Sequence, residues 1–78
     1  MNYSKVYDEI ANLWKRIARH HDSIEFWCKI WIQLIRKDRI GSPEYFFVRQ
    51  AIDYHDSEID MLLMNIKELE KMVFDFSF

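Results

Sequence analysis

The sequence predicts an all-α fold: a long antiparallel helical hairpin, one domain over residues 1–78, that self-associates into a four-helix or larger bundle. Apolar side chains recur every seven residues in both halves of the chain, which is typical of long amphipathic helices. The only Gly and the only Pro lie near the midpoint, at positions 41 and 43. The first half carries a net positive charge and the second a net negative charge, so the two arms attract each other when they lie side by side.

We expect the first helix over about residues 3–39. One heptad position holds Tyr3, Ile10, Ile17, Ile24 and Trp31, and a second holds Val6, Leu13, His20, Trp27 and Leu34. An adjacent row widens this stripe beyond a dimeric coiled-coil seam, which favours a bundle. Asp22 and Glu25 could form a capping box, so a kink near residues 20–23 is the alternative to one continuous helix.

The break between the helices is expected at residues 40–43. Basic residues followed by Gly41 are typical of a helix C-terminus, and Ser42, Pro43 and Glu44 of a helix N-terminus. The second helix is expected over about 43–74, with its repeat at Tyr45, Ile52, Ile59, Ile66 and Val73. We expect the aromatic tail, 74–78, to pack near Tyr3 and Tyr7.

A turn centred near Gly41 makes facing residue numbers sum to roughly 83 in an antiparallel pair. This register places Trp31 opposite Ile52 and Cys28 opposite His55.

Composition excludes several classes of protein. Half of the residues are apolar, too many for a disordered chain. The single Cys excludes an internal disulfide and favours a reducing, cytoplasmic location. We expect no signal peptide and no membrane span, and the net charge of -2 argues against a nucleic-acid partner.

Residues 24–35 are apolar around most of a helix, so one facing helix cannot cover them. A second apolar row, Phe47, Tyr54 and Met61, lies off the main stripe of the second arm. We therefore predict an oligomer interface made of Ile24, Trp27, Cys28, Ile30, Trp31, Ile32, Ile35, Phe47, Tyr54 and Met61.

Cys28 and His55 suggest a nucleophilic pair, but no third orienting group accompanies them, and we expect no enzyme activity and no cofactor. Weak candidates for metal ligands are His21, His55 and Glu58. The preferred interpretation is a polar histidine layer that fixes the helix register. Its titration near neutral pH would weaken assembly on mild acidification.

Basic residues lie beside aromatic rings in two places, an arrangement that can hold an anion and stack a base. The candidate anion-binding residues are Tyr3, Tyr7, Trp14, Lys15, Arg16, Arg19, Arg36, Lys37, Arg39 and Arg49.

The segment 56–63 is similar to the Ser-Gln-Glu-Leu-Asp signature of small helical-hairpin phosphatases that act on sporulation response regulators. Glu58 and Asp60 match its acidic positions, whereas Asp56 and Ser57 replace the Ser and the Gln. These departures leave the chain unassigned to that family.

The sequence therefore predicts a small non-enzymatic interaction protein, a regulator or inhibitor that acts as a homo-oligomer on a macromolecular partner, most simply another protein. The alternative is an oligomer that sequesters a small anionic ligand, such as a nucleotide, at basic–aromatic subunit junctions.

Overall fold

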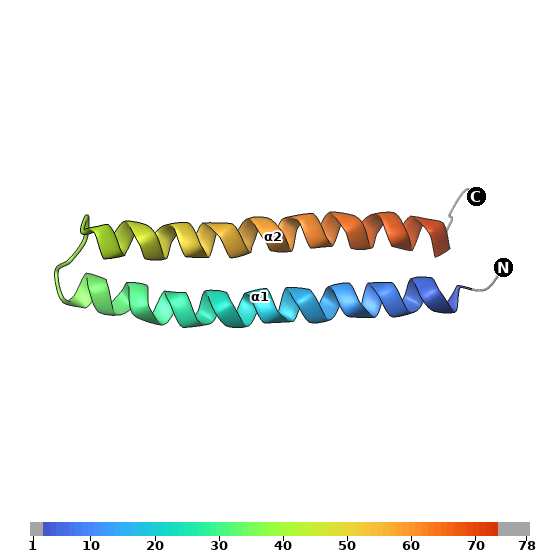
Figure 1. Ribbon diagram of the computed structural model, residues 1–78, viewed down its shortest axis with the longest axis horizontal. Coiled ribbons are helices and arrows are strands. Elements are labelled where there is room, and N and C mark those ends of the chain that lie inside the picture. The colour runs from blue at the N-terminus through green and yellow to red at the C-terminus, as the bar shows by residue number, and fades with distance from the viewer. Residues whose placement is uncertain (1–2, 74–78) are drawn as a thin grey trace.

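The computed structural model describes residues 3–73, which form two antiparallel helices, α1 (Ser4–Arg36) and α2 (Pro43–Val73) (Figure 1). The molecule extends over 58 × 20 × 16 Å. The predicted all-α hairpin is confirmed. The aromatic tail, 74–78, lies outside the described residues, so its predicted packing near Tyr3 and Tyr7 stays a prediction.

Helix α1 continues without a break through residues 20–23, where a kink was the alternative. Asp22 and Glu25 are both exposed residues of the continuous helix. The hydroxyl of Ser23 donates to the carbonyl oxygen of Arg19 at 3.1 Å, a back-bond one turn away that a helical Ser can make without ending the helix. Neither helix, over residues 3–73, contains an apolar stretch long enough to cross a bilayer.

Helix α1 ends at Arg36, three residues before the predicted end, because Asp38, three positions before Gly41, already adopts the left-handed conformation. The N–H of Asp38 donates to Ile35 at 3.0 Å, and the N–H of Arg39 donates to Leu34 at 2.9 Å. These two bonds form a Schellman motif, which needs a positive φ at its C′ residue. Asp38 supplies φ 56°, a conformation that Asp tolerates better than most residues.

Helix α2 begins as the sequence predicts. The backbone N–H of Tyr45 donates to the hydroxyl of Ser42 at 3.3 Å, so Ser42 is the N-cap and Pro43 the first helical residue. Glu44 lies 3.3 Å from the guanidinium of Arg39. Hydrogen bonds from its own backbone N–H and from Ser42, together with the charge of Arg39, lower the pKa of the Glu44 carboxyl below its ordinary 4.5.

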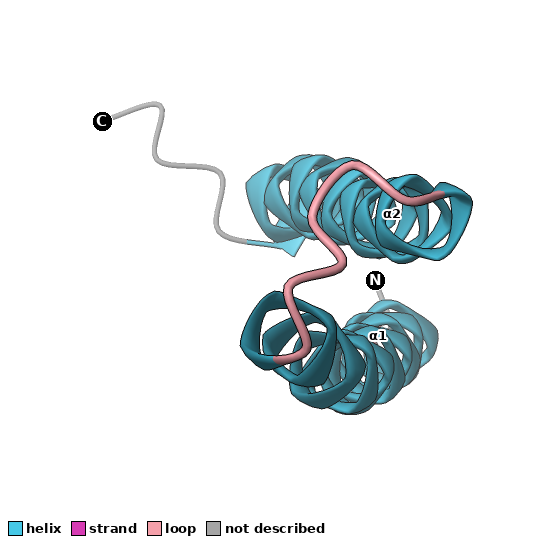
Figure 2. Cartoon of the chain, turned by 90° about the vertical axis from the view of Figure 1, so that its left-hand side faces the viewer, coloured by secondary structure: helices cyan, strands magenta, loops and turns pink. Residues whose placement is uncertain are grey.

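The core is a single row of aliphatic side chains between two helices, as the end-on view in Figure 2 illustrates. Within the described part of the chain the buried residues are Leu13, Ile17, Val48, Ile59, Leu62 and Ile66. Five of them form one cluster, with Ile10, Ile24 and Leu69 packed against it. Val48 lies apart from that cluster, nearer the turn.

The helices pair in a different register from the one predicted. His20, not Cys28, lies against His55. The ring of Trp31 packs on Tyr45, with centroids 6.1 Å apart, one heptad nearer the turn than its predicted partner Ile52. The early end of α1 contributes to this shift, because the residue at which a helix stops sets how the next one aligns with it.

Candidate interaction surface

The hairpin exposes more surface than a compact protein of its mass. Its accessible surface is 6305 Å², whereas a compact monomer of 9.7 kDa exposes about 5,100 Å². The excess of roughly 1,200 Å² exceeds the area that each partner buries in a standard protein interface, about 800 Å². This excess comes from the elongated shape and from many large apolar side chains that no second layer covers.

One group of side chains between the centre of the hairpin and the turn forms what we call the aromatic face: Phe26, Trp27, Phe47, Tyr54 and the pair His20 and His55. Trp27 contacts Phe26 edge-on at 5.3 Å and Phe47 edge-on at 5.6 Å between centroids. The rings of Phe26, Phe47 and Tyr54 are each more than half exposed. The rings therefore support one another within the hairpin while presenting apolar surface to solvent.

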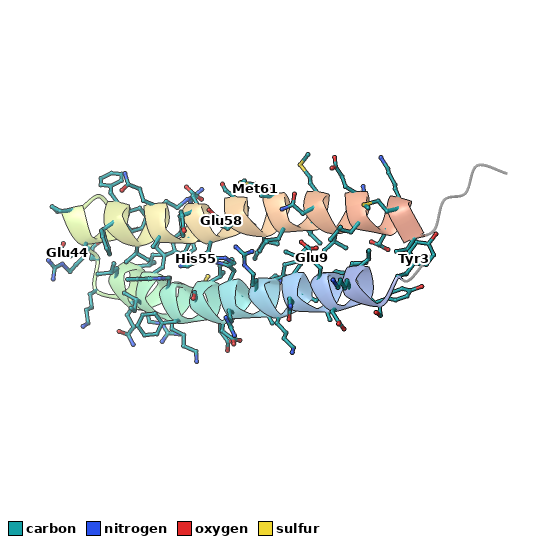
Figure 3. The ribbon with its side chains drawn as sticks, turned by 45° about the vertical axis from the view of Figure 1, so that its right-hand side comes forward. Tyr3, Glu9, Glu44, His55, Glu58 and Met61 are labelled. Atoms are coloured by element: carbon teal, nitrogen blue, oxygen red, sulfur yellow. The ribbon has the colours of Figure 1, made fainter. Side chains whose placement is uncertain are left out.

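The two histidines on this face contact each other directly. The Nδ1 atoms of His20 and His55 lie 2.8 Å apart, a hydrogen-bond distance, and the ring of Tyr54 lies edge-on to both imidazoles. Figure 3 shows His55 between the helices, whereas Met61 points away from them. One neutral imidazole must donate from Nδ1 and the other accept there. The predicted histidine layer is thus a contact between α1 and α2.

A second apolar row lies along α1 on the other side of its buried stripe, by helix geometry. We call it the second face, and its members are seven residues apart: Tyr7, Trp14, His21, Cys28 and Ile35. Trp14 and Tyr7 are about half exposed. Cys28 lines an open hollow of about 150 Å³ with Trp31, Arg49, Ile52 and Asp53.

The predicted interface residues are divided between the interior of the hairpin and its outer surface. Ile24 packs on the aliphatic core, and Trp27 and Trp31 pack on α2. Those that remain largely exposed are Ile32, Ile35, Phe47, Tyr54 and Met61, whereas Cys28 and Ile30 are half-buried.

Two contributors to the aromatic face were missed by the sequence analysis. Phe26 was not predicted as an interface residue, although it precedes Trp27 and lies seven residues after Arg19. His20 was not recognised as the partner of His55. Its signal was its position as the middle residue of α1, on the same heptad row as the apolar residues Leu13 and Trp27.

The candidate anion-binding residues do not form one site within a single chain. Four of the candidate cations lie at or near the turn: Arg36, Lys37, Arg39 and Arg49. Carboxylates already pair with two of them, because Arg39 lies 3.3 Å from Glu44 and Arg49 lies 3.6 Å from Asp53. Arg36 and Lys37 are exposed there. Tyr3 is the N-cap of α1, and Tyr7 and Trp14 lie in the first half of that helix. The second group, Lys15, Arg16 and Arg19, lies in the middle of α1, and none of the three ion pairs among the described residues uses it.

The catalytic and metal candidates are not brought together either. Cys28 lies beside Ile52 and Asp53, so the proposed pairing with His55 is wrong. His21 belongs to the second face and does not share the contact between His20 and His55. Within residues 3–73, no group of three or more His, Cys, Asp or Glu side chains converges on a point that could hold a metal ion.

Comparison with known proteins adds no assignment to this geometry. The chain matches no family model, no curated protein and no solved structure.

Proposed function

We propose that the chain is a non-enzymatic interaction protein, a regulator or inhibitor that acts as a homo-oligomer by binding another protein. The observation that carries this proposal is the large apolar surface left outside a core of six buried residues in the part of the chain that the structure describes. Monomeric soluble proteins rarely expose contiguous apolar patches of this kind, and such patches are typical of protein–protein contacts. Aromatic rings also dominate the binding energy of such contacts.

Two apolar faces provide for two kinds of contact. The aromatic face is supported by ring contacts between α1 and α2, so it is held in one shape before binding, which lowers the entropic cost of association. We assign this face to self-association. The second face, with Trp14 and Tyr7 about half exposed, lies on the other side of α1 and stays accessible in such an oligomer. We assign it to the partner protein.

Native mass spectrometry of protein taken directly from cells tests this proposal, because it reports subunit number and bound protein together. We expect an oligomer with an additional protein mass. Replacement of Phe47 by Glu is expected to dissolve the oligomer, and replacement of Trp14 by Glu to remove the added mass while the oligomer persists. Gln33→Glu, at an exposed polar position of α1, is the matched control.

Two results would contradict the proposal. A monomer at micromolar concentration rules out the homo-oligomer. An oligomer that carries no protein at any stage of purification, and that retains its composition in Trp14→Glu, rules out the role of the second face in partner binding.

A second candidate is an oligomer that sequesters a small anionic ligand, such as a nucleotide. It rests on Lys15, Arg16 and Arg19, whose charges take part in none of the ion pairs between described residues. Trp14, whose ring is about half exposed, lies near them in the sequence but on the second face of α1. Under this hypothesis the added mass is a small molecule. Simultaneous replacement of the three cations by Glu should abolish that mass and leave the oligomer intact.

A further inference from the structure

The histidine pair lies at the centre of the hairpin and leaves two hydrogen-bonding atoms unused. His20 is the middle residue of the 33-residue α1. Its Nδ1 is engaged with His55 at 2.8 Å. Among the described residues, Trp31 Nε1 is the only buried side-chain nitrogen or oxygen without a partner, so the Nε2 atoms of both histidines remain accessible from outside.

The tautomers of the two histidines determine which Nε2 atom donates a hydrogen bond and which one accepts it. The imidazole that donates from Nδ1 has a bare Nε2, and the imidazole that accepts at Nδ1 carries an Nε2–H. The pair therefore presents one acceptor and one donor toward the surface. A second copy of the same pair presents the same two groups. The two pairs are therefore complementary when the Nε2–H of each pair lies against the bare Nε2 of the other pair.

We propose that the aromatic face binds a second copy of this chain with both turns at the same end, so that the four histidines close a ring of hydrogen bonds. This inference rests on the self-association in the proposed function. His20 lies against the partner's His55 across a two-fold axis parallel to the helices. Each neutral imidazole then donates one hydrogen bond and accepts one, which satisfies all eight ring nitrogens.

Three observations select this orientation over the head-to-tail one. A same-end dimer places α1 against the α2 of its partner, whereas a head-to-tail dimer places α1 against α1. The first half of the chain has eight Lys or Arg and five Asp or Glu, and the second half three and eight, so only the same-end dimer pairs helices of opposite charge.

The distribution of polarity along the hairpin is the second observation. The turn-proximal part of the aromatic face is built from Phe26, Trp27, Phe47 and Tyr54. Nearer the chain ends the surface along the two helices carries more charge: Glu9, Arg16, Asn65 and Glu68 line an open hollow together with Leu13, Leu69 and Met72. A same-end dimer matches rings with rings, whereas a head-to-tail dimer buries rings against charges.

The third observation is the histidine pair itself. In a symmetric head-to-tail dimer His20 meets the partner's His20, so a hydrogen bond between them requires different tautomers in the two copies, whereas the same-end dimer closes its ring with the same tautomers in both. Small half-buried residues one turn from the pair, Ser23 on α1 and Ala51 on α2, permit the helices of the second copy to approach closely at this layer.

Protonation of a histidine in this ring of hydrogen bonds weakens the dimer. An imidazolium has two N–H donors and no acceptor, so it breaks the ring and adds charge to a desolvated layer. Within four residues of the pair, the other charged or titratable groups on this side are Arg16, Arg19, Tyr54 and Glu58, and Arg, Tyr and Glu side chains ordinarily keep their charge state between pH 5.5 and 7.5. Histidine is the side chain that ordinarily changes charge in this interval.

Disulfide trapping in a Cys28→Ser background tests the orientation. Ser23→Cys protein and Ala51→Cys protein are prepared separately and mixed at pH 7.5 under mild oxidation. We expect a disulfide-linked heterodimer from the mixture, and little linkage within either single preparation, because Ser23 lies against the partner's Ala51 only in the same-end dimer. Linkage of Ser23→Cys to itself, or no linkage in a preparation that is dimeric, overturns the inference while the proposed function stands.

Sedimentation equilibrium tests the histidine ring. We expect the wild-type dimer Kd to rise about tenfold or more between pH 7.5 and 5.5, the size expected when buried donors lose their acceptors. The double variant His20→Gln, His55→Gln should lose this dependence, because Gln donates and accepts but does not titrate. The control His21→Gln should keep it. A wild-type Kd that is independent of pH, or a pH dependence that vanishes in His21→Gln, overturns the proposed ring of four hydrogen-bonded histidines. A wild-type monomer at pH 7.5 overturns the proposed function as well.

Discussion

The two halves of the hairpin are packed by different kinds of side chain. The half near the chain ends has a continuous aliphatic core, in which Leu13 and Ile17 of α1 pack against Ile59, Leu62 and Ile66 of α2. In the half near the turn, Val48 is the one hydrophobic residue among those described that is buried. The contacts between helices there include ring contacts: Trp27 on Phe47, and Trp31 on Tyr45.

The two halves differ in how far a pair of helices covers their apolar side chains. Aliphatic side chains fill the narrow seam between two helices, whereas large rings extend beyond it and leave their outer surfaces in water. The turn half also holds Trp31, whose buried indole N–H has no acceptor among the described residues, a costly arrangement in a finished core. Folding free energy should therefore come mainly from the aliphatic half, and association from the aromatic half.

The largest effect is expected from the aliphatic half. Ile66 is 2 % exposed, and its replacement by Ala should lower the free energy of unfolding by about 2–4 kcal/mol through lost burial and an unfilled cavity. Urea unfolding followed by circular dichroism measures this loss. Met64→Ala, at a residue of the same helix that is 65 % exposed, should change it by less than about 0.5 kcal/mol.

Replacement of Phe47 by Ser tests the aromatic half. We expect the dimer Kd, measured by sedimentation, to rise about tenfold or more, as for an aromatic residue at the centre of an interface. Unfolding of the monomer at low concentration should change little, because Phe47 is 61 % exposed in the hairpin. A loss of monomer stability as large as that of Ile66→Ala would show that the two halves do not differ in the way described.

Two substitutions in the turn should have opposite signs. Asp38 has φ 56° and Gly41 has φ 85°, and a side chain at such angles is strained. Asp38→Gly should raise the free energy of unfolding by up to about 1 kcal/mol, and Gly41→Ala should lower it by about 1 kcal/mol. No atom lies within 4 Å of the added Cβ at Gly41, so backbone strain alone is responsible. Thermal unfolding of the two variants measures the difference.

The smallest effect concerns pH at the start of α2. The pKa of Glu44 is lowered in the folded chain, first by its own backbone N–H and then by Ser42 and Arg39. Its contribution to stability is therefore present above the ordinary pKa of 4.5 and is lost as the pH falls through the lowered folded value. We expect Glu44→Gln to reduce the fall in melting temperature between pH 6 and 3. A carboxyl resonance that titrates at or above pH 4.5 in NMR would contradict this prediction.

The two helices could be predicted from the sequence, but the register in which they pair could not. Ser42 and Pro43 act at the start of α2 as expected. The sequence predicts that Gly41 ends α1, yet the helix ends earlier because Asp38 adopts the left-handed conformation that Gly41 also has, and spacing alone does not show which of the two ends the helix. A heptad repeat also tolerates a shift of seven residues, since Tyr45 and Ile52 hold equivalent positions. The pairing of Trp31 with Tyr45 therefore could not be deduced from periodicity.

The candidate surface was predictable in composition and not in geometry. The exposed row of Phe47, Tyr54 and Met61 followed from its distance from the buried stripe, and all three residues are exposed. The contact of His20 with His55 depends on the register, which the sequence analysis misplaced. The same error put Cys28 opposite His55, because an antiparallel pairing converts one misjudged helix end into a wrong partner at every position.

Because the chain reverses direction once, Ser4 and Val73 lie at the same end of a rod, far from the turn (Figure 1). A helix of 33 residues spans about 50 Å at its usual rise. A same-end dimer is consequently a particle with two unlike poles: four helix termini at one, and two turns that carry Arg36, Lys37 and Arg39 at the other. Anything tethered to either terminus is held tens of ångströms from the basic pole, so the hairpin would serve its attachments as a rigid spacer with a fixed direction.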